Sequence, residues 1–275
     1  MYRLVVASLL LLTTDPDGVS SESRNRLVHL LKNSDAQDIV ETGKKIAKLT
    51  VYKDNEISSS TYGLELCVLH IRSGAAKFNV LNARVTEPPR HAYERLVPKE
   101  SIGAITGGFF AIGDRNELVP IGLVKVNGKT MNRAATWKSG GVLYTTQGGI
   151  SIVPIESFRD SREVLDAVQS KPLLIEDGVD GIRTNGRDWF DRSAIAITET
   201  GDYVLAVLHA PSGNASSLAE FSYLLSIIYP DKSTKIKWAI AMDGGPGAHL
   251  YVPKLKKHCG DGSPNYIPNI VYASP

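Results

Sequence analysis

Residues 240–247 of the chain read Ile-Ala-Met-Asp-Gly-Gly-Pro-Gly, a carboxylate between an apolar stretch and a glycine-rich turn. Glycine loses more conformational freedom on folding than any other residue, so such a turn is costly for stability alone. It lets the backbone approach a ligand closely, and turn N–H groups often hold a carboxylate at a strand end. The lysine and helix of a phosphate-binding P-loop do not follow. Asp243 therefore marks either a functional carboxylate or a structural turn.

Two basic residues stand at the start of apolar runs. Arg192 precedes Ser-Ala-Ile-Ala-Ile, and Lys171 precedes Pro172 and Leu-Leu-Ile. An arginine anchored at a strand start presents a planar fork that suits bidentate contact with phosphate or carboxylate. The alternative for Arg192 is a surface ion pair with Asp191, which stabilises a fold little. Lys171 is either a cation on the phosphate side of a site or a surface residue.

Two further segments combine glycine with polar residues. The sequence Thr106-Gly107-Gly108-Phe109 ends an apolar run. Its N–H groups could bind an anionic oxygen, or the glycines form a tight bend. Residues 176–191 carry aspartates among glycines and could bind calcium, although the spacing does not match an EF-hand loop; a solvated loop is the alternative. These aspartates are Asp177, Asp180, Asp188 and Asp191.

In their order along the chain, these segments resemble the phosphodiester glycosidase family. That family shows Asn-Gly-Gly-Phe-Phe, a Pro-x-Gly-Leu strand before an Asn-Gly hairpin, Gln-Ser-x-Pro-x-Leu, Arg-Thr-Ala and Leu-Asp-Gly-Gly-x-Ser. The resemblance covers about residues 51–275, with Thr106 in place of the asparagine and Gly247-Ala248 in place of the serine-containing end. The matching segments are residues 106–110, 120–123 with 127–128, 169–174, 192–194 and 242–248.

The resemblance implies a hydrolase that frees a sugar from a sugar 1-phosphodiester by breaking the anomeric C–O bond. The leaving phosphate monoester is a weak base, so it needs charge neutralisation more than protonation, a role assigned to Arg192 and Lys171. Asp243 is the carboxylate that faces the oxocarbenium-like transition state, and Asp177 is either a second one or a turn residue. No cofactor or metal is expected, although the aspartates of residues 176–191 leave calcium open. The expected substrate contacts are Thr106, Gly107, Gly108, Phe109, Lys171, Ser193, Gly244, Gly245 and Pro246.

Two other functions remain open. A glycan- or cell-wall-binding protein that has kept the fold and lost the chemistry would explain the departures at Thr106 and Ala248. A phosphodiesterase would break the P–O bond instead of the C–O bond.

Hydrophobic periodicity predicts the elements that position these residues. Apolar positions at helical spacing indicate two helices within residues 20–49, and shorter helical patterns follow at 160–167 and 216–228, where Ser216 or Ser217 could cap the helix. Alternating β-branched segments then predict strands, and Asn127-Gly128 predicts a type I′ hairpin. The expected strands cover residues 64–71, 78–83, 121–126, 141–145, 150–153, 194–198, 203–208, 238–242 and 270–273.

Strands and helices do not alternate regularly, which favours α+β with a curved, mixed or mainly antiparallel sheet over a Rossmann fold or a barrel. The predicted organisation is a signal peptide at residues 1–14, a helical extension at 15–49 and one phosphodiester glycosidase-like domain at 50–275.

Composition and the N-terminus indicate the compartment and exclude some partners. With 31 basic and 29 acidic residues, and one dense lysine cluster at 254–257, the chain has no basic stripe for nucleic acid. Arg3 precedes an apolar run at residues 4–12 that is too short to span a bilayer and is typical of a signal peptide. We therefore expect a secreted or periplasmic protein; the alternative is a cytoplasmic one. Cys67 and Cys259 could form a disulfide, but spacing does not decide this.

Overall fold

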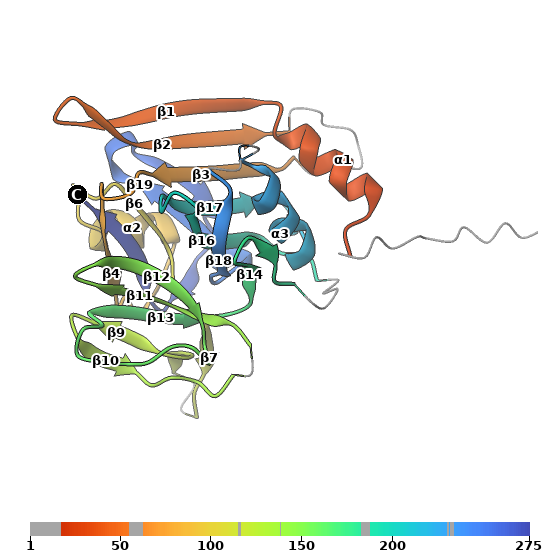
Figure 1. Cartoon of the computed structure of the whole chain (residues 1–275). Coiled ribbons are helices and arrows are strands. Elements are labelled where there is room, and N and C mark those ends of the chain that lie inside the picture. The colour runs from red at the N-terminus through yellow and green to blue at the C-terminus, as the bar shows by residue number, and fades with distance from the viewer. Residues whose placement is uncertain are drawn as a thin grey trace, which may run out of the picture.

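The computed structural model describes residues 18–54, 63–114, 117–137, 139–182, 188–229, 231 and 234–275. The described chain is α+β, as predicted, with antiparallel sheets and helices α1 (Ser21–Leu30), α2 (Pro89–Leu96) and α3 (Leu218–Ile227) (Figure 1). Short 3-10 turns occur at Gly245–Gly247 and Pro253–Leu255. Within these ranges no helix combines the length and apolarity needed to cross a bilayer. The predicted signal peptide, residues 1–14, lies outside the described residues.

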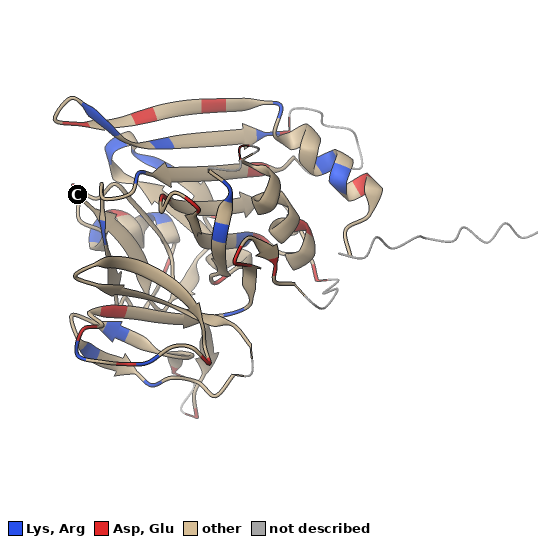
Figure 2. Cartoon of the chain, in the orientation of Figure 1, with Lys and Arg blue, Asp and Glu red and all other residues tan. Residues whose placement is uncertain are grey.

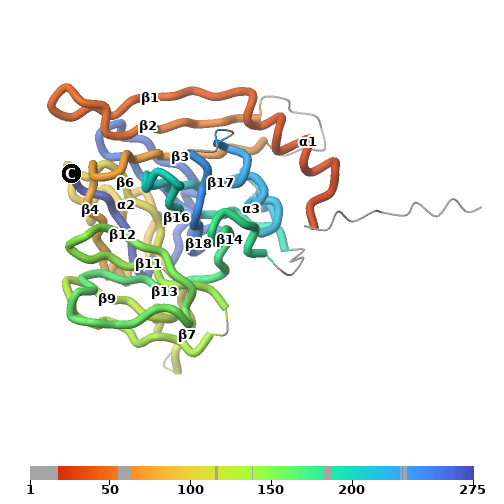
Figure 3. Tube along the Cα trace, in the orientation of Figure 1, coloured from red at the N-terminus to blue at the C-terminus, as the bar shows by residue number. Residues whose placement is uncertain are grey.

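An eight-stranded antiparallel sheet is the largest unit. Its order is β1 (Ser34–Glu41), β2 (Lys44–Lys53), β3 (Glu65–Ile71), β17 (Tyr203–His209), β16 (Arg192–Thr198), β18 (Ile236–Ala241), β14 (Leu173–Glu176) and β15 (Val179–Asp180). Strands far apart in the sequence thus lie side by side, as the trace of β3 next to β17 shows (Figure 3).

The remaining strands form two five-stranded sheets and two small pairs. One five-stranded sheet has the order β10 (Lys129–Asn132), β9 (Val124–Val126), β13 (Asp166–Ser170), β11 (Gly141–Thr146) and β12 (Gly149–Pro154). The other has the order β20 (Lys257–Gly260), β19 (His249–Val252), β6 (Gly103–Thr106), β22 (Ile270–Ser274) and β4 (Lys77–Leu81). The small pairs are β21 (Asn265–Ile267) with β5 (Val85–Glu87), and β7 (Phe110–Ile112) with β8 (Leu118–Pro120).

The central strands of the large sheet are buried on both faces, and successive side chains of each strand point alternately into two cores. On β3, Cys67 and Leu69 belong to the core shared with the five-stranded sheets, whereas Leu66 and Val68 belong to the core shared with α1 and α3. Strands buried on both faces lose the polar–apolar alternation of a half-exposed sheet. This burial explains why the central strands of the sheet read as nearly continuous apolar runs.

The predicted helix over residues 216–228 is confirmed as α3. Ser217 is its N-cap and forms a capping box with Glu220, in which each side chain accepts a hydrogen bond from the other residue's backbone N–H. The helix buries Phe221, Leu224 and Leu225 against the large sheet.

The first of the two predicted N-terminal helices corresponds to α1, but the second is wrong. Residues 34–53 form the hairpin β1–β2, with Thr42 and Gly43 at positive φ in its turn. On β2 the buried residues Ala47, Leu49 and Val51 recur with period two, which is a strand pattern. The charged residues are acidic on β1 and basic on β2 (Figure 2), and Lys45 pairs with Asp38 at 2.7 Å. Since β2 runs through residue 50 and pairs with β3, this segment belongs to the large sheet.

A second error concerns residues 160–167, where no helix forms. Asp166 instead begins β13, and its buried carboxylate accepts a hydrogen bond from the Asn127 backbone at 3.2 Å. The Asn127-Gly128 hairpin itself is confirmed: both residues have positive φ and join β9 to β10.

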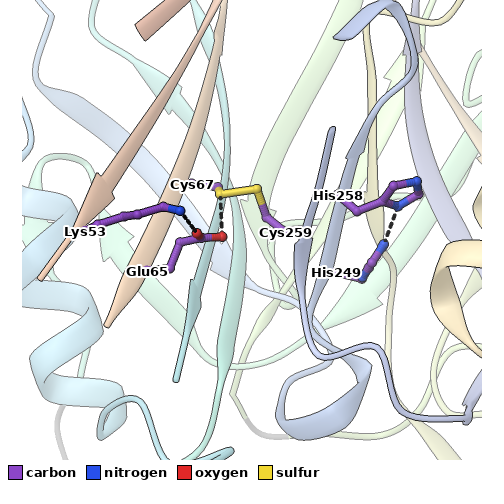
Figure 4. Close-up of a disulfide and its surroundings, with 6 residues drawn as sticks. All are labelled: Lys53, Glu65, Cys67, His249, His258 and Cys259. Carbon is purple, nitrogen blue, oxygen red and sulfur yellow. Dashed lines mark hydrogen bonds and ion pairs between the residues drawn. A yellow bond between two sulfur atoms is a disulfide. The ribbon is translucent and has the colours of Figure 1, made fainter. Parts of the chain in front are cut away.

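A disulfide joins the large sheet to a five-stranded sheet. Cys67 on β3 is bonded to Cys259 on β20, 192 residues away, with their Cα atoms 6.4 Å apart (Figure 4). Cys67 is fully buried and Cys259 is 3% exposed. In the chain-entropy view, a cross-link that closes so long a loop removes many conformations from the unfolded state.

We therefore expect the double substitution Cys67→Ser and Cys259→Ser to lower the free energy of unfolding by about 2–5 kcal/mol. Urea unfolding of oxidised wild type and the double variant would measure this difference. Reductant should lower the midpoint of the wild type and leave that of the variant unchanged. Equal midpoints for the two oxidised proteins would contradict the stabilising role.

Candidate active site

A pocket of about 440 Å³ opens where β16 begins and β18 ends. The two strands pair antiparallel, with Ala194 opposite Ala241, so the start of one meets the end of the other at the same edge of the sheet. This pairing brings Arg192 and Asp243 to one cavity, although they are far apart in the sequence. The lining comprises Phe109, Phe110, Lys171, Pro172, Phe190, Arg192, Ser193, Leu218, Phe221, Ala241, Met242, Asp243, Gly244, Gly245, Pro246 and Asn265.

Asp243 is a buried carboxyl group with an unpaired oxygen. Its backbone N–H donates to the Gly107 carbonyl at 2.8 Å, and its carbonyl accepts from Ser193 Oγ at 2.5 Å. The residue is 7% exposed, and its Oδ2 has no hydrogen-bond partner among the described residues. Burial raises the pKa of Asp243 to about 7, and a hydrogen bond from the Gly244 backbone opposes the shift only in part. A small change in its surroundings can therefore switch this carboxyl between charged and neutral near neutral pH.

The turn after Asp243 leaves little room beside this carboxyl. A Cβ atom at Gly247 would lie 2.7 Å from Asp243 Oδ2 and 3.0 Å from Asn265 Nδ2. Glycine at this position therefore lets the carboxyl keep its place next to Asn265.

Arg192 is held by backbone carbonyls. Its Nε donates to Ser216 O at 3.0 Å and its Nη2 donates to Asp188 O at 2.5 Å, while the guanidinium lies 5.4 Å from the Phe190 ring centroid. These bonds use two of the five N–H donors of the guanidinium, so three remain for a ligand. Burial lowers the pKa of Arg192, yet an arginine stays charged in a protein.

The alternative interpretation of Arg192 as a surface ion pair with Asp191 is wrong. Asp191 is fully buried, and its carboxylate accepts hydrogen bonds from His209 Nδ1 and from the Ala210 backbone at 3.0 Å.

Several other predicted residues also line the pocket. Lys171 is an exposed side chain whose Nζ lies 5.0 Å from the Trp137 ring centroid, and it precedes the cis peptide bond to Pro172. The Ser193 hydroxyl donates a hydrogen bond to the backbone carbonyl of Asp243. The other predicted residues in the lining are Phe109, Gly244, Gly245 and Pro246.

Thr106, Gly107 and Gly108 are not among the pocket-lining residues. Thr106 is buried on β6, while the Gly107 and Gly108 N–H groups donate to Asn269 O at 3.0 Å and to Asn269 Oδ1 at 2.8 Å. A Cβ at Gly107 would lie 1.8 Å from Asn269 Oδ1. In the structure this glycine pair therefore allows close approach to Asn269, and its N–H groups bind that residue.

Asp177 lies apart from the pocket lining. It occupies the β14–β15 turn with positive φ, its side chain is 74% exposed, and its carboxylate lies 3.5 Å from Lys237 Nζ. The other aspartates of the proposed calcium loop have separate partners: Asp180 binds Ser222 and Asp191 binds His209. In the described chain the one group of three clustered metal-ligand side chains is Glu65, Cys67 and Cys259, whose cysteines form the disulfide.

Residues 99–273 match the family model of phosphodiester glycosidases. The chain belongs to this family. It is also 26% identical over 159 residues to the uncharacterized protein YigE of Escherichia coli K12, covering 54% of this chain and 57% of that protein. The chain therefore spans little more than half the length of that relative.

Solved structures show the same fold at low sequence identity. The catalytic domain of zebrafish N-acetylglucosamine-1-phosphodiester alpha-N-acetylglucosaminidase, auto-inhibited by its pro-peptide, matches with a TM-score of 0.62 at 12% identity over 88% of each chain. A hypothetical protein from Synechocystis matches with 0.58 at 14% identity, over 87% of this chain and 63% of that one. A protein of Burkholderia pseudomallei K96243 that is named as exported matches with a TM-score of 0.56 at 11% identity, over 78% of this chain and 75% of that one.

Sequence reasoning missed several lining residues of this phosphodiester glycosidase-family pocket. Phe110 is adjacent to a predicted residue, and Phe190 directly precedes the Asp191-Arg192 pair, so an aromatic residue beside a candidate cation was an available signal. Asn265 lies on β21 and follows Pro264 in a turn-rich segment, with no pattern that connects it to Asp243. The others are Pro172, Ala241 and Met242, which neighbour predicted residues, and Leu218 and Phe221 on α3, for which helical periodicity predicted only a helix.

We predict that Gly247→Ala lowers the free energy of unfolding by about 1–3 kcal/mol, because the new methyl group overlaps the Asp243 carboxyl. Gly262→Ala is the matched control, since a Cβ at Gly262 meets no atom within 4 Å. Its unfolding free energy should stay within about 0.5 kcal/mol of the wild type. Equal losses in the two variants, measured by urea unfolding, would contradict the crowding around Asp243.

Proposed function

We propose that this protein hydrolyses a sugar 1-phosphodiester at the anomeric C–O bond, with Asp243 as the reacting carboxylate and Arg192 and Lys171 at the phosphate. The observation that carries the proposal is the buried, unpaired carboxyl oxygen of Asp243 in a cavity that two basic side chains also line. Buried carboxyls without partners are costly, and perturbed pKa values concentrate at functional sites.

The charges of the pocket fit the needs of this reaction. Departure of a phosphate monoester from the anomeric carbon puts negative charge on the phosphate and positive charge on the sugar ring. Arg192 and Lys171 neutralise the first, and the ionised Asp243 stabilises the second, as a nucleophile or as the base that activates water. A phosphate leaving group needs little protonation, so a second carboxyl acid is not required. Asp177, which lies outside the pocket lining, is not needed in this scheme.

The apolar walls favour a ligand with hydrocarbon surface. Phe109, Phe110 and Phe190 line the cavity together with Leu218 and Pro246. Ligand pockets commonly combine such walls with a few polar groups that fix orientation. We infer that the rings cover C–H faces of the sugar or its aglycone, while the polar side chains select the phosphodiester.

Isotopic labelling separates this function from the alternatives. In ¹⁸O water, C–O cleavage places the label in the released sugar, whereas P–O cleavage by a phosphodiesterase places it in the phosphate. A panel of sugar 1-phosphodiesters, tested with and without chelator, would also show any dependence on calcium. Binding of these compounds without turnover would favour the glycan-binding alternative, which the departures from the family motif at Thr106 and Ala248 support.

The pH dependence of the reaction should follow Asp243. Because its pKa is raised to about 7, the carboxylate form is lost as pH falls through about 7, and kcat/KM should fall with it.

Asp243→Asn should reduce kcat/KM by about 100-fold or more, a loss of roughly 3 kcal/mol of transition-state stabilisation.

Unfolding supplies the control for this variant. A raised carboxyl pKa means that the folded state resists ionisation, so wild-type stability declines as pH rises from 3.8 towards about 7. The unfolding temperature of Asp243→Asn at pH 8 should therefore be no lower than that of the wild type. Near-normal turnover by the variant would contradict the assignment of Asp243 as the reacting carboxylate.

Arg192→Lys tests the phosphate contact. A lysine keeps the charge but loses the planar fork, so we expect about a tenfold or greater loss on the phosphodiester. The loss should be smaller on an activated aryl glycoside of the same sugar, whose leaving group carries no phosphate. Damage to the fold would lower both rates alike and cancel from their ratio. An unchanged ratio would remove Arg192 from the phosphate site.

We further propose that the protein is secreted or periplasmic. The apolar run at residues 4–12, the Cys67–Cys259 disulfide and the likeness to a protein named as exported support this location. Mass spectrometry of the functional protein should find an N-terminus beyond Leu12. An intact Met1 on active protein from the native host would contradict cleavage.

A further inference from the structure

We propose that His209 is a positioning residue, which acts through the buried carboxylate of Asp191 to hold Arg192 and the Gly244-Gly245 turn at the pocket. The inference rests on the proposed function for its catalytic consequence, but the contacts that carry it are independent of any substrate.

Asp191 connects the two sides of the site. Its carbonyl accepts a hydrogen bond from the Gly245 N–H at 2.8 Å, and a Cβ at Gly244 would lie 2.7 Å from the same oxygen. Asp191 also precedes Arg192 in the chain, so its backbone fixes where β16 begins. A shift of Asp191 would therefore move both the Arg192 side chain and the turn that follows Asp243.

The side chain of Asp191 depends on His209 for its charge partner. Its Oδ2 is hydrogen-bonded to His209 Nδ1, and its Oδ1 accepts from the Ala210 backbone at 3.0 Å. The Asp191 side chain is fully buried, whereas that of His209 is 21% exposed. Removal of one partner from a buried ion pair leaves an uncompensated charge, which the surrounding structure must move to accommodate.

His209 lines a different cavity, of about 400 Å³, and is not among the residues that line the pocket with Arg192. The cavity is bordered by Glu65, His258, Pro211 and Gly260 among others. His209 can thus exchange its proton with solvent there, while Asp191 is sealed from water. This places the titrating member of the pair outside the substrate pocket.

The groups that face His209 favour its charged form. Burial by itself lowers the pKa of His209, but the hydrogen bond to Asp191 and the charges of Asp191, Asp261 and Glu65 together raise it above 6.5. The nearby His249 is neutral, because burial lowers its pKa to about 3. The ion pair is therefore present below pH 6.5, and is lost as pH rises through the raised pKa of His209.

Two substitutions separate the hydrogen bond from the charge. His209→Asn keeps a donor near the Nδ1 position without a titrating group, and His209→Ala removes both. The matched control is His70→Gln, because His70 forms a similar pair with Asp202 at 2.8 Å, and their side chains are 22% and 21% exposed. His70 lies on β3 and binds Tyr229 with its other nitrogen, outside the pocket lining.

Hydrogen exchange provides a readout that needs no substrate. At pH 6.5 the Gly245 amide, which donates to Asp191, should exchange about tenfold or more faster in His209→Ala than in wild type. His209→Asn keeps the donor without the charge and should restore only part of the protection, and His70→Gln should leave this amide unchanged. Unchanged exchange at Gly245 in a folded His209→Ala variant would overturn the proposal, whether or not the protein hydrolyses phosphodiesters.

Kinetics then test the catalytic consequence. KM for the phosphodiester that the wild type hydrolyses should rise about fivefold or more in His209→Ala, with a smaller change for the aryl glycoside. The decline in wild-type kcat/KM on the alkaline side of the Asp243 ionisation should disappear in His209→Asn. If His209→Ala fails to fold, an unchanged alkaline decline in the Asn variant would overturn the proposal.

Discussion

The antiparallel pairing of β16 with β18 is the interaction on which the candidate site depends. Its register, with Ala194 opposite Ala241, places the start of one strand beside the end of the other. Met242 N then donates to Ser193 O at 2.9 Å, and Ser193 Oγ donates to Asp243 O, so the contacts with β16 continue past the end of β18. A one-residue slip would turn these side chains to the opposite face. Successive residues of both strands pack alternately into the two cores, so the packing that fixes the faces of the strands also fixes the geometry of the charged pocket.

Much of this architecture follows from local sequence signals. The strands at residues 194–198 and 238–242, the Asn127-Gly128 turn and the Ser217 cap of α3 were all predictable, because period, turn chemistry and capping act within a few residues. The ends of the two strands then indicated Arg192 and Asp243. The failed prediction of a second N-terminal helix has a local cause too, since the Thr42-Gly43 turn and the period-two burial on β2 were outweighed by an apparent helical spacing.

The parts that sequence could not supply are contacts between distant segments. Nothing near Gly107 or Gly108 indicates that their N–H groups bind Asn269, so anion binding and a tight bend both remained open until the fold was known. Likewise Asp191 looked like a surface partner of Arg192 because they are neighbours in sequence, whereas burial pairs it with His209. Asp177 looked like a second carboxylate because it follows an apolar run, but that run ends in an exposed turn. In each case the residue type indicated a polar contact, but the sequence did not indicate the partner.

The unpaired oxygen of the Asp243 carboxyl also depends on contacts that the fold makes or leaves out. In this chain Gly247 occupies the position where the family motif carries serine, so a hydroxyl is absent from the atoms nearest to Oδ2. The fold could have satisfied this oxygen with another donor, as it does for Asp191 and Asp166, yet Oδ2 stays buried without one in the described chain. A carboxyl in that position destabilises the folded state when it ionises. A ligand that donates a hydrogen bond to Oδ2 would offset this cost on binding. The unpaired oxygen of Asp243 is therefore the atom of the pocket that gains most from a polar ligand, which agrees with the role proposed for this carboxyl.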